Sequence, residues 1–296
     1  MDSRDWMGQT ALHRAAHNGH TSVIQKLLES GLDLEREDRS GKTALFSAAE
    51  SGNLLTVKFL LQRGASVNHK DNFGCTAIHA AVSARKHNVI RHLLDGGSEI
   101  ESRDQSGNTP LHSAVQGAEY EGPYLLITYG ANIEAENDSK RTPLHIAAAL
   151  ESNAVLNLLL IKGANIHAED GTGKTPLHIA AESGKGKALE ILIEKGTNIV
   201  TRTHQGQTAL HLASAERKFW TESLLLQRGA DMDARDKYGR LAIPRGREPQ
   251  GYERPGTKKK GLGDAEMSSE ATSSIESYNV RAPAFSRTGV KTAMSI

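Results

Sequence analysis

The sequence predicts an all-α solenoid, a stack of short helix-turn-helix units with β-turn fingers between them, and not a domain built around one central core. The first observation is a Thr-x-x-His fragment, or a close variant of it, that returns every 33 residues without a slip. Its first residue falls at Thr10, Thr43, Thr76, Thr109, Thr142, Thr175 and Thr208. The second is composition: aromatic residues make up 4% of the chain and apolar residues 38%. Small and aliphatic side chains must therefore pack closely spaced helices, as in tandem repeats.

The predicted array spans residues 5–243. Its seven full units open at Asp5, Asp38, Asp71, Asp104, Asn137, Asp170 and Thr203. An eighth unit opens at Asp236 and is only partial, because Pro244 falls where a helix interior is required. Residues 247–296 are rich in Ser, Gly, Pro, Thr and charge and have no period, so they are predicted to be a disordered tail.

Each unit begins with a polar turn, such as residues 104–107, in which Asp and Gly suit a tight turn. The Thr hydroxyl is then the predicted N-cap of a first helix, and three units place a proline at the first helical position. These prolines are Pro110, Pro143 and Pro176. An alanine five residues after each Thr, from Ala15 to Ala213, lets neighbouring helices approach. A second helix carries paired aliphatic residues and ends at a glycine, from Gly31 to Gly229.

Two units depart from this pattern. Unit four has Gly117, Gly122 and Pro123 around the start of its second helix, which predicts a shortened helix and a soft point in the array. Unit five has Lys140 where the other turns have glycine, which puts its turn geometry in doubt.

At these residues the chain resembles the ankyrin repeat, whose signature is Thr-Pro-Leu-His-x-Ala. Residues 142–147 and 175–180 match this signature in full, and the resemblance covers residues 5–243. It implies L-shaped units stacked into a curved array with a concave groove, and binding of proteins through the fingers and the inner helices. It also implies that the histidine of the fragment hydrogen-bonds locally. That position holds His13, His79, His112, His145, His178 and His211, with Phe46 in unit two.

Charge and composition exclude several classes of protein. Lys and Arg number 36 and Asp and Glu 35, so no net field recruits nucleic acid or an anionic membrane. A single cysteine, Cys75, excludes an intrachain disulfide and a cysteine-based zinc cluster. No signal peptide or membrane-spanning segment is expected. We therefore expect an intracellular protein, cytoplasmic or nuclear, that is a monomer and takes neither nucleic acid nor a membrane as its partner.

Two motifs imitate chemical sites. Residues 168–175 fit a relaxed phosphate-loop pattern, but they span a boundary between units, follow no hydrophobic strand and end at the predicted N-cap Thr175. His13 and His17 have the spacing of a zinc helix, but Arg14 stands where a zinc protease has its glutamate. No catalytic residue, metal ligand or cofactor is expected. The sequence favours a non-catalytic scaffold or adaptor; the alternative is a regulatory portion or fragment of a larger signalling protein or enzyme.

The candidate partner-binding residues lie on the fingers, which the resemblance points away from the stack. Finger positions hold ten basic and four acidic residues, whereas residues 1–244 as a whole hold 27 basic and 29 acidic ones. The basic candidates are Arg39, Lys42, Lys70, Arg103, Arg141, Lys174 and Arg202. The apolar candidates are Trp6, Met7, Phe73 and Tyr238, since aromatic side chains anchor interfaces. The expected partner is a protein with an acidic segment; the competing interpretations are that exposed turns simply favour charge and that Trp6 and Met7 pack back on unit one.

Overall fold

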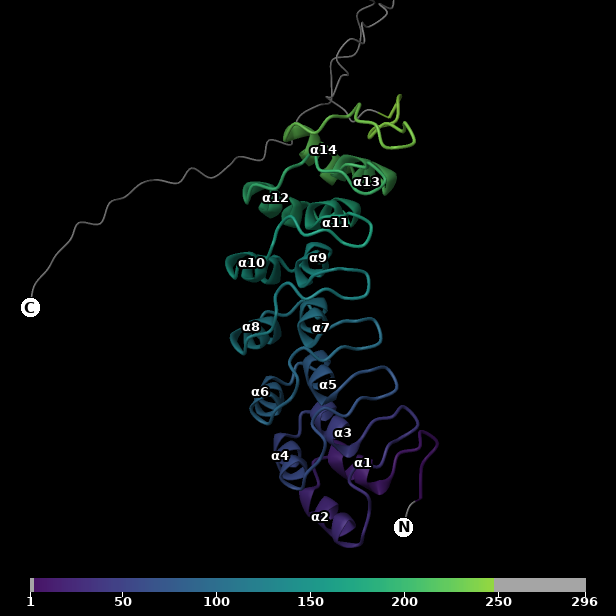
Figure 1. The fold of residues 1–296 in the computed structure, drawn as a ribbon, viewed down its shortest axis with the longest axis vertical. Helices are drawn as coiled ribbons and strands as arrows, with labels where there is room; N and C mark the ends of the chain where they lie inside the picture. The colour runs from purple at the N-terminus through teal and green to yellow at the C-terminus, as the bar shows by residue number, and fades with distance from the viewer. Residues whose placement is uncertain (1–2, 248–296) are drawn as a thin grey trace, which may run out of the picture. The chain divides into compact units, whose positions relative to one another are not determined.

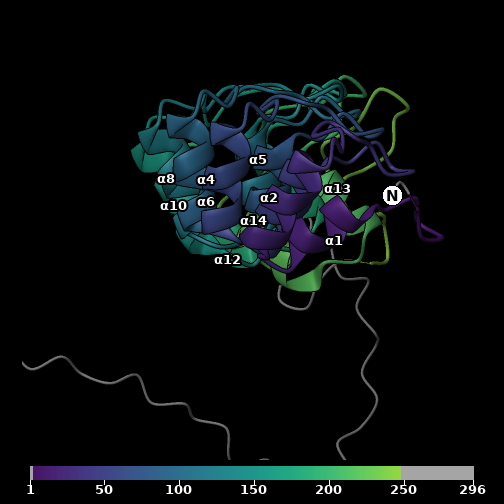
Figure 2. The same cartoon turned by 90° about the horizontal axis from the view of Figure 1, so that it is seen from below.

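The structure is a computed structural model that describes residues 3–247. In this range the chain forms fourteen α-helices in seven antiparallel pairs, and each pair stacks on the next. Figures 1 and 2 show the odd-numbered helices in one layer, the even-numbered helices in a second layer, and the connecting loops together on one side. The all-helical solenoid predicted from the sequence is confirmed. None of the helices described is long and apolar enough to cross a membrane.

The odd-numbered helices are the inner layer and the even-numbered helices the outer layer. The inner helices are α1 (Ala11–His17), α3 (Ala44–Ser51), α5 (Ala77–Ser83), α7 (Pro110–Gln116), α9 (Pro143–Ala148), α11 (Pro176–Glu182) and α13 (Ala209–Ala215). The outer helices are α2 (Thr21–Glu29), α4 (Leu54–Gln62), α6 (His87–Asp95), α8 (Glu121–Thr128), α10 (Asn153–Ile161), α12 (Gly186–Glu194) and α14 (Phe219–Gln227). The threonines precede the inner helices as N-caps, and the three prolines occupy first-turn positions, as predicted.

The core is a column of small and aliphatic residues that the 33-residue period keeps in register. The eighth residue of every unit, from Leu12 to Ile243, is at most 2% exposed. The alanines from Ala15 to Ala213 are at most 5% exposed and lie where inner helices contact one another. Each unit therefore buries its apolar face only against its neighbours, which makes the array one-dimensional.

The fingers owe their shape to the residue that opens each unit. Its side-chain oxygen accepts hydrogen bonds from the backbone N–H groups two and four residues later, as Asp104 does from Ser106 and Asn108, both at 2.8 Å. All eight openings make this pair of bonds, including Asn137 and Thr203. The side chain takes the place of a turn carbonyl, which explains why Asp, Asn or Thr is required there.

Backbone hydrogen bonds join consecutive fingers into a continuous row. The second residue of each finger donates from its N–H group to the third residue of the finger before it, over 2.8–3.1 Å. Seven such bonds run from Arg39 and Met7 at one end to Lys237 and Gln205 at the other. Finger side chains are therefore held at a fixed spacing, one repeat apart.

The turn of unit five is retained in spite of Lys140. Lys140 adopts φ +56°, in the left-handed region that the glycines of the other turns occupy at φ +73° to +77°. At Gly107 a Cβ atom would lie 2.3 Å from the side chain of Asp138, the second residue of the next finger. The residue equivalent to Asp138 in the next finger after Lys140 is Gly171, which has no side chain to collide. Gly171 therefore removes the side-chain part of the crowding around Lys140. At Gly107 the added Cβ atom would also lie 2.7 Å from the backbone nitrogen of Asp138, which a glycine in the next finger does not remove.

Unit four keeps its place in the stack with a slightly shorter outer helix. α8 has eight residues, whereas every other outer helix has nine. Gly122 and Pro123 are buried in its first turn, where the missing N–H group of proline is tolerated. The linker before α8 contains Ala118 at φ +56°. The predicted shortening is confirmed.

The partial eighth unit covers the end of unit seven without forming a helix. It forms a turn, an isolated β-bridge between Arg235 and Leu241, and a buried segment ending at Ile243. Ile243 is 0% exposed and fills the core position that a helix supplies in the full units. The last described residue, Arg247, donates to the backbone of Ser214 and forms an ion pair with Glu222. Residues 248–296 of the predicted tail lie outside the described residues, and Arg247 is the only residue of that predicted segment that is described.

Candidate protein-interaction surface

The histidines of the Thr-x-x-His fragments form a ladder of hydrogen bonds behind the fingers. In His112, Nδ1 accepts from the backbone N–H of Thr109 at 3.2 Å, so the proton is on Nε2, which donates to the carbonyl of Arg141 in the next finger at 2.9 Å. His13, His79, His145 and His211 make the same contacts, and His178 donates instead to Thr201. Burial lowers the pKa of five of these imidazoles, and that of His178 falls to about 4. The local role implied by the resemblance is confirmed: five of the six rings join the inner helix of their unit to the next finger, and His178 bonds to Thr201 just before it.

Four of the basic candidates, called here the braced basic row, are exposed and donate to backbone carbonyls. Lys70, Arg103 and Arg202 hold the same finger position, with Glu136 and Glu169 at that position between the last two, and Arg39 stands at another position of its finger. Arg39, Lys70, Arg103 and Arg202 are exposed. Arg103 donates to the carbonyl of Glu136 at 2.6 Å and Arg202 to that of Arg235 at 2.6 Å, in each case one repeat further along. Lys70 donates to Arg103 in the same way, and Arg39 donates back to Trp6. A carbonyl orders a guanidinium or ammonium group without cancelling its charge, so this braced basic row stays positive and is held in place.

The other three basic candidates are paired with carboxylates. Lys42 lies 3.2 Å from Glu50 and over the ring of Phe46, and Lys174 contacts both carboxylate oxygens of Glu182 at 2.8 Å. Arg141 contacts Asp170 at 3.3 Å. Their charge is offset locally, so they contribute less to the field over the fingers than the braced basic row does.

The aromatic candidates project from their fingers into solvent. Trp6 is 79% exposed, Tyr238 70% and Phe73 59%, and Met7 is 40% exposed. The suggestion that Trp6 packs back on unit one has no support in this exposure. Arg240 lies over the ring of Tyr238 at 5.0 Å. These side chains are separated along the row of fingers and do not form one cluster.

Between the fingers and the inner helices lie hollows that can receive side chains of a partner. One, of about 530 Å³, is lined by Phe73, Phe46, Lys42 and Glu50 among others. It also contains Cys75, whose thiol has its pKa raised to about 11 by burial and by the nearby Asp71 and Asp104. The thiol therefore stays protonated near neutral pH and behaves as a small lining group. A second hollow, of about 400 Å³, lies at the C-terminal end.

The segment that imitates a phosphate loop is an ordinary finger. The backbone N–H groups of Thr172 and Lys174 donate to the carboxylate of Asp170, and the ammonium group of Lys174 is bound to Glu182. Thr175 is the N-cap of α11. The donors that would hold a phosphate are occupied within the protein.

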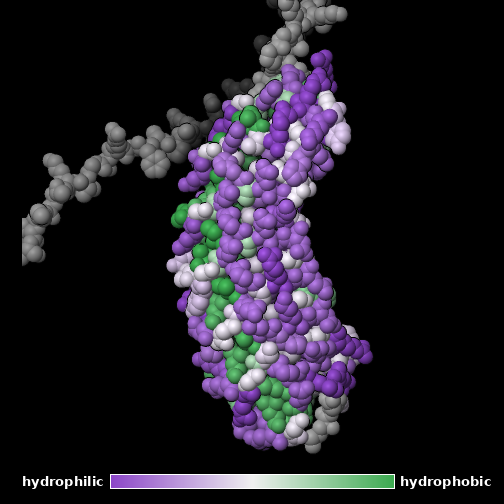
Figure 3. Space-filling model, viewed as in Figure 1, coloured by the Kyte–Doolittle hydropathy of each residue, from purple (hydrophilic) through white to green (hydrophobic). Residues whose placement is uncertain are grey.

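Sequence reasoning missed the exposed apolar side chains of the outer helices. Phe219 is 64% exposed and Trp220 is 70% exposed at the start of α14, and Tyr120 stacks on Tyr124 at the start of α8. Figure 3 shows hydrophobic residues as a broken band that follows the outer helices along the array. An alignment of the units could have revealed them, because most other units carry small or polar residues where unit seven has Phe219 and Trp220.

Comparisons with known proteins agree with this geometry. A family model described as ankyrin repeats in three copies matches residues 1–71, 64–137 and 144–236. Among solved structures, the crystal structure of the human ASB11 ankyrin repeat domain matches with a TM-score of 0.66 and 27% sequence identity. That match covers 75% of this chain and 99% of the ASB11 chain. No curated protein sequence matches. Because the family model covers most of the residues, the chain belongs to the ankyrin repeat family.

Proposed function

We propose that this chain is a non-catalytic scaffold or adaptor that binds an acidic segment of a partner protein along its fingers and inner helices. Ankyrin repeats are in general protein-interaction modules, and the fold itself is non-catalytic. The observation that carries the proposal is the braced basic row: four exposed cations on the fingers, each donating to a backbone carbonyl of a neighbouring finger. Lys70 and Arg103 are one repeat apart, and Arg202 holds the same finger position three repeats further on. Ordered cations lose little side-chain entropy when a carboxylate binds them.

Exposed aromatic side chains on the finger of Lys70 and on the first and last fingers support the proposal. Trp6, Phe73 and Tyr238 expose large apolar surface that an interface would bury, and such residues dominate binding energy. The cations would steer an acidic partner and the aromatics would slow its dissociation. Lys42, Arg141 and Lys174 contribute less, because each has a carboxylate of its own.

The test separates the two contributions. The partner is first captured with the full chain, identified by mass spectrometry and purified. Changing Arg39, Lys70 and Arg202 together to Gln should slow its association at low salt and flatten the salt dependence of the rate. Changing Trp6 and Phe73 to Ala should raise the dissociation rate at least tenfold. Leu55→Ala, at a 74% exposed position of α4, is the matched control on the outer layer. If Leu55→Ala weakens binding and the finger variants do not, the partner occupies the outer helices and the proposal is wrong.

A further inference from the structure

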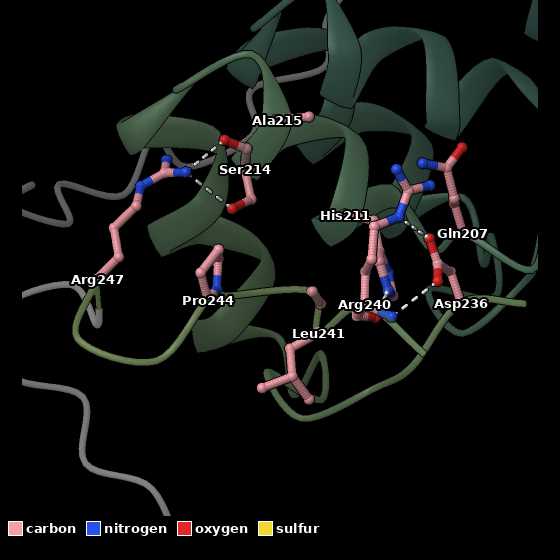
Figure 4. Close-up of a pocket in the computed structure, with 10 residues that line it drawn as sticks. Gln207, His211, Ser214, Ala215, Asp236, Arg240, Leu241, Pro244 and Arg247 are labelled. Atoms are coloured by element: carbon pink, nitrogen blue, oxygen red, sulfur yellow. Dashed lines mark hydrogen bonds and ion pairs between the residues drawn. The ribbon is translucent and has the colours of Figure 1, made fainter. Parts of the chain in front are cut away.

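The hollow at the C-terminal end of the array differs from the others in having an apolar floor between two arginines. Its floor includes Ala215, at the end of α13, with Leu241 and Pro244 of the partial eighth unit. Figure 4 shows Arg247 beside Ser214 at one end and Arg240 beside Asp236 at the other, with Pro244 and Leu241 between them. Its volume of about 400 Å³ lies within the range of pockets that bind small ligands or single anchoring side chains.

Both guanidinium groups are held in place by buried carboxylates. The Nε atom of Arg240 donates to Asp236 at 2.7 Å, and the guanidinium group lies over Tyr238. Burial opposes the charge of Asp236, but hydrogen bonds from Arg240 and from backbone N–H groups hold its pKa below the usual range. Arg247 contacts Glu222 at 2.7 Å and donates to the backbone carbonyl of Ser214. The carboxylates of Asp236 and Glu222 are at most 1% exposed.

Arg240 is the better candidate for a receptor of anions. Its side chain is 60% exposed, whereas that of Arg247 is 32% exposed. Because Asp236 engages Nε, the two terminal nitrogens of Arg240 remain for an acceptor outside the protein, and this edge of a guanidinium binds carboxylate in a bidentate manner. The pocket therefore offers an apolar floor next to one ordered cation.

We infer that this pocket binds a peptide segment of a partner protein that carries an aliphatic or aromatic side chain next to an aspartate or glutamate. The apolar side chain would lie over Ala215, Leu241 and Pro244, and the neighbouring carboxylate would bind the terminal nitrogens of Arg240. The inference rests on the proposed function, since it assigns one anchoring point of the acidic partner to the C-terminal end of the finger row. It adds a site that the sequence did not indicate.

The test uses a random library of 12-residue peptides displayed on phage and selected on the full chain. We expect selection to enrich peptides with an acidic residue beside Leu, Ile, Met or Phe. Enriched peptides are synthesised with a fluorescent label and titrated by anisotropy. Ala215→Trp, which fills the pocket from an exposed position, and Arg240→Gln should each weaken binding at least tenfold. Arg240→Lys, which keeps the charge but loses the fork, should fall between Arg240→Gln and the unchanged chain.

His17→Trp is the matched control, because His17 holds the position in unit one that Ala215 holds in unit seven and is also exposed. It should change affinity less than twofold. Circular dichroism and Tm verify folding of every variant, and Leu241→Ser replaces Ala215→Trp if the latter does not fold. Failure to enrich acidic-apolar peptides, or equal binding to the chain with a filled pocket, overturns the inference.

The two proposals fail in different ways. If Trp6→Ala and Phe73→Ala release the captured partner while Ala215→Trp leaves the selected peptides bound, the finger surface stands and the pocket is wrong. If the pocket variants abolish peptide binding while the finger variants leave the partner bound, the pocket stands and the finger surface is wrong.

Discussion

The first two repeats and the last two follow the same 33-residue pattern but bury their ends differently. Helix α2 has one buried residue, Ile24, whereas α14 has five. The C-terminal pair is covered by the partial eighth unit, with Ile243 at the core position. Repeats six and seven carry the imidazole ladder, but repeat two has Phe46 in its place. The pattern thus fixes the fold, while a few residues decide how strongly each end is coupled to its neighbours.

The largest expected effect comes from a substitution in the partial eighth unit, which covers the C-terminal end. Ile243→Ala should lower the free energy of unfolding by about 3 kcal/mol, because it leaves a cavity at a position that is 0% exposed. Amide hydrogen exchange should show α13 and α14 opening first. The matched change at the other end is Val23→Ala, at a 44% exposed residue of α2, with an expected loss of at most about 0.5 kcal/mol. Equal losses at the two ends would contradict the comparison.

The second effect is a loss of stability at acidic pH, which we expect in repeat six, with His178, and not in repeat two, with Phe46. The folded pKa of His178, about 4, lies below the unfolded value of about 6.5. The unfolded chain therefore binds the proton first as pH falls, so stability is full above pH ~6.5 and declines between pH ~6.5 and ~4. His178 alone should remove about 2 kcal/mol between pH 7 and pH 5.

Denaturant unfolding at pH 7 and pH 5 measures this loss, and His178→Phe is the comparison, since repeat two shows that the position accepts phenylalanine. The variant should lose less stability on acidification than the unchanged chain. Hydrogen exchange corrected for intrinsic rates should show repeat six loosening more than repeat two. An unchanged pH dependence in His178→Phe would remove His178 as the cause.

The fold could be predicted almost entirely from sequence, because each local choice recurs in every unit and points to the same structure. The retained turn at Lys140 could not, since the side-chain crowding that it avoids depends on the next finger, at Gly171. The surface was predicted in part. Charge and aromatic positions on fingers were readable, but the division between the braced basic row and the ion-paired Lys42, Arg141 and Lys174 depends on partners eight to 33 residues away.

The third effect concerns repeat four, which lies between the two ends. Glycine and proline in the first turn of α8 weaken its helix, so repeat four should open before repeats two and six, by about 1 kcal/mol. Native-state hydrogen exchange measures the order of opening. Gly122→Ala should reduce the difference, because the added Cβ atom would meet Ala114 at an ordinary contact distance of 3.6 Å. Uniform protection of the amides across the array would contradict this prediction.

The smallest expected effect concerns an ion pair that occurs at the same position in repeats two and six. Lys42 and Glu50 in repeat two have the same register as Lys174 and Glu182 in repeat six, but the second pair is closer, with both oxygens at 2.8 Å against one at 3.2 Å. The Lys174 side chain is 18% exposed and that of Lys42 26%. Because both pairs lie at the surface, Lys174→Ala should cost at most about 1 kcal/mol, and Lys42→Ala less.

The same variant also tests the phosphate-loop imitation. The N–H groups of Thr172 and Lys174 already donate to Asp170, so a nucleotide would have to displace internal bonds to bind there. Thermal unfolding with and without ATP and Mg²⁺ should give the same Tm for the unchanged chain and for Lys174→Ala. A saturable rise in Tm with ATP that disappears in Lys174→Ala, and not in Lys42→Ala, would show that repeat six binds nucleotide and that its lysine serves more than the ion pair with Glu182.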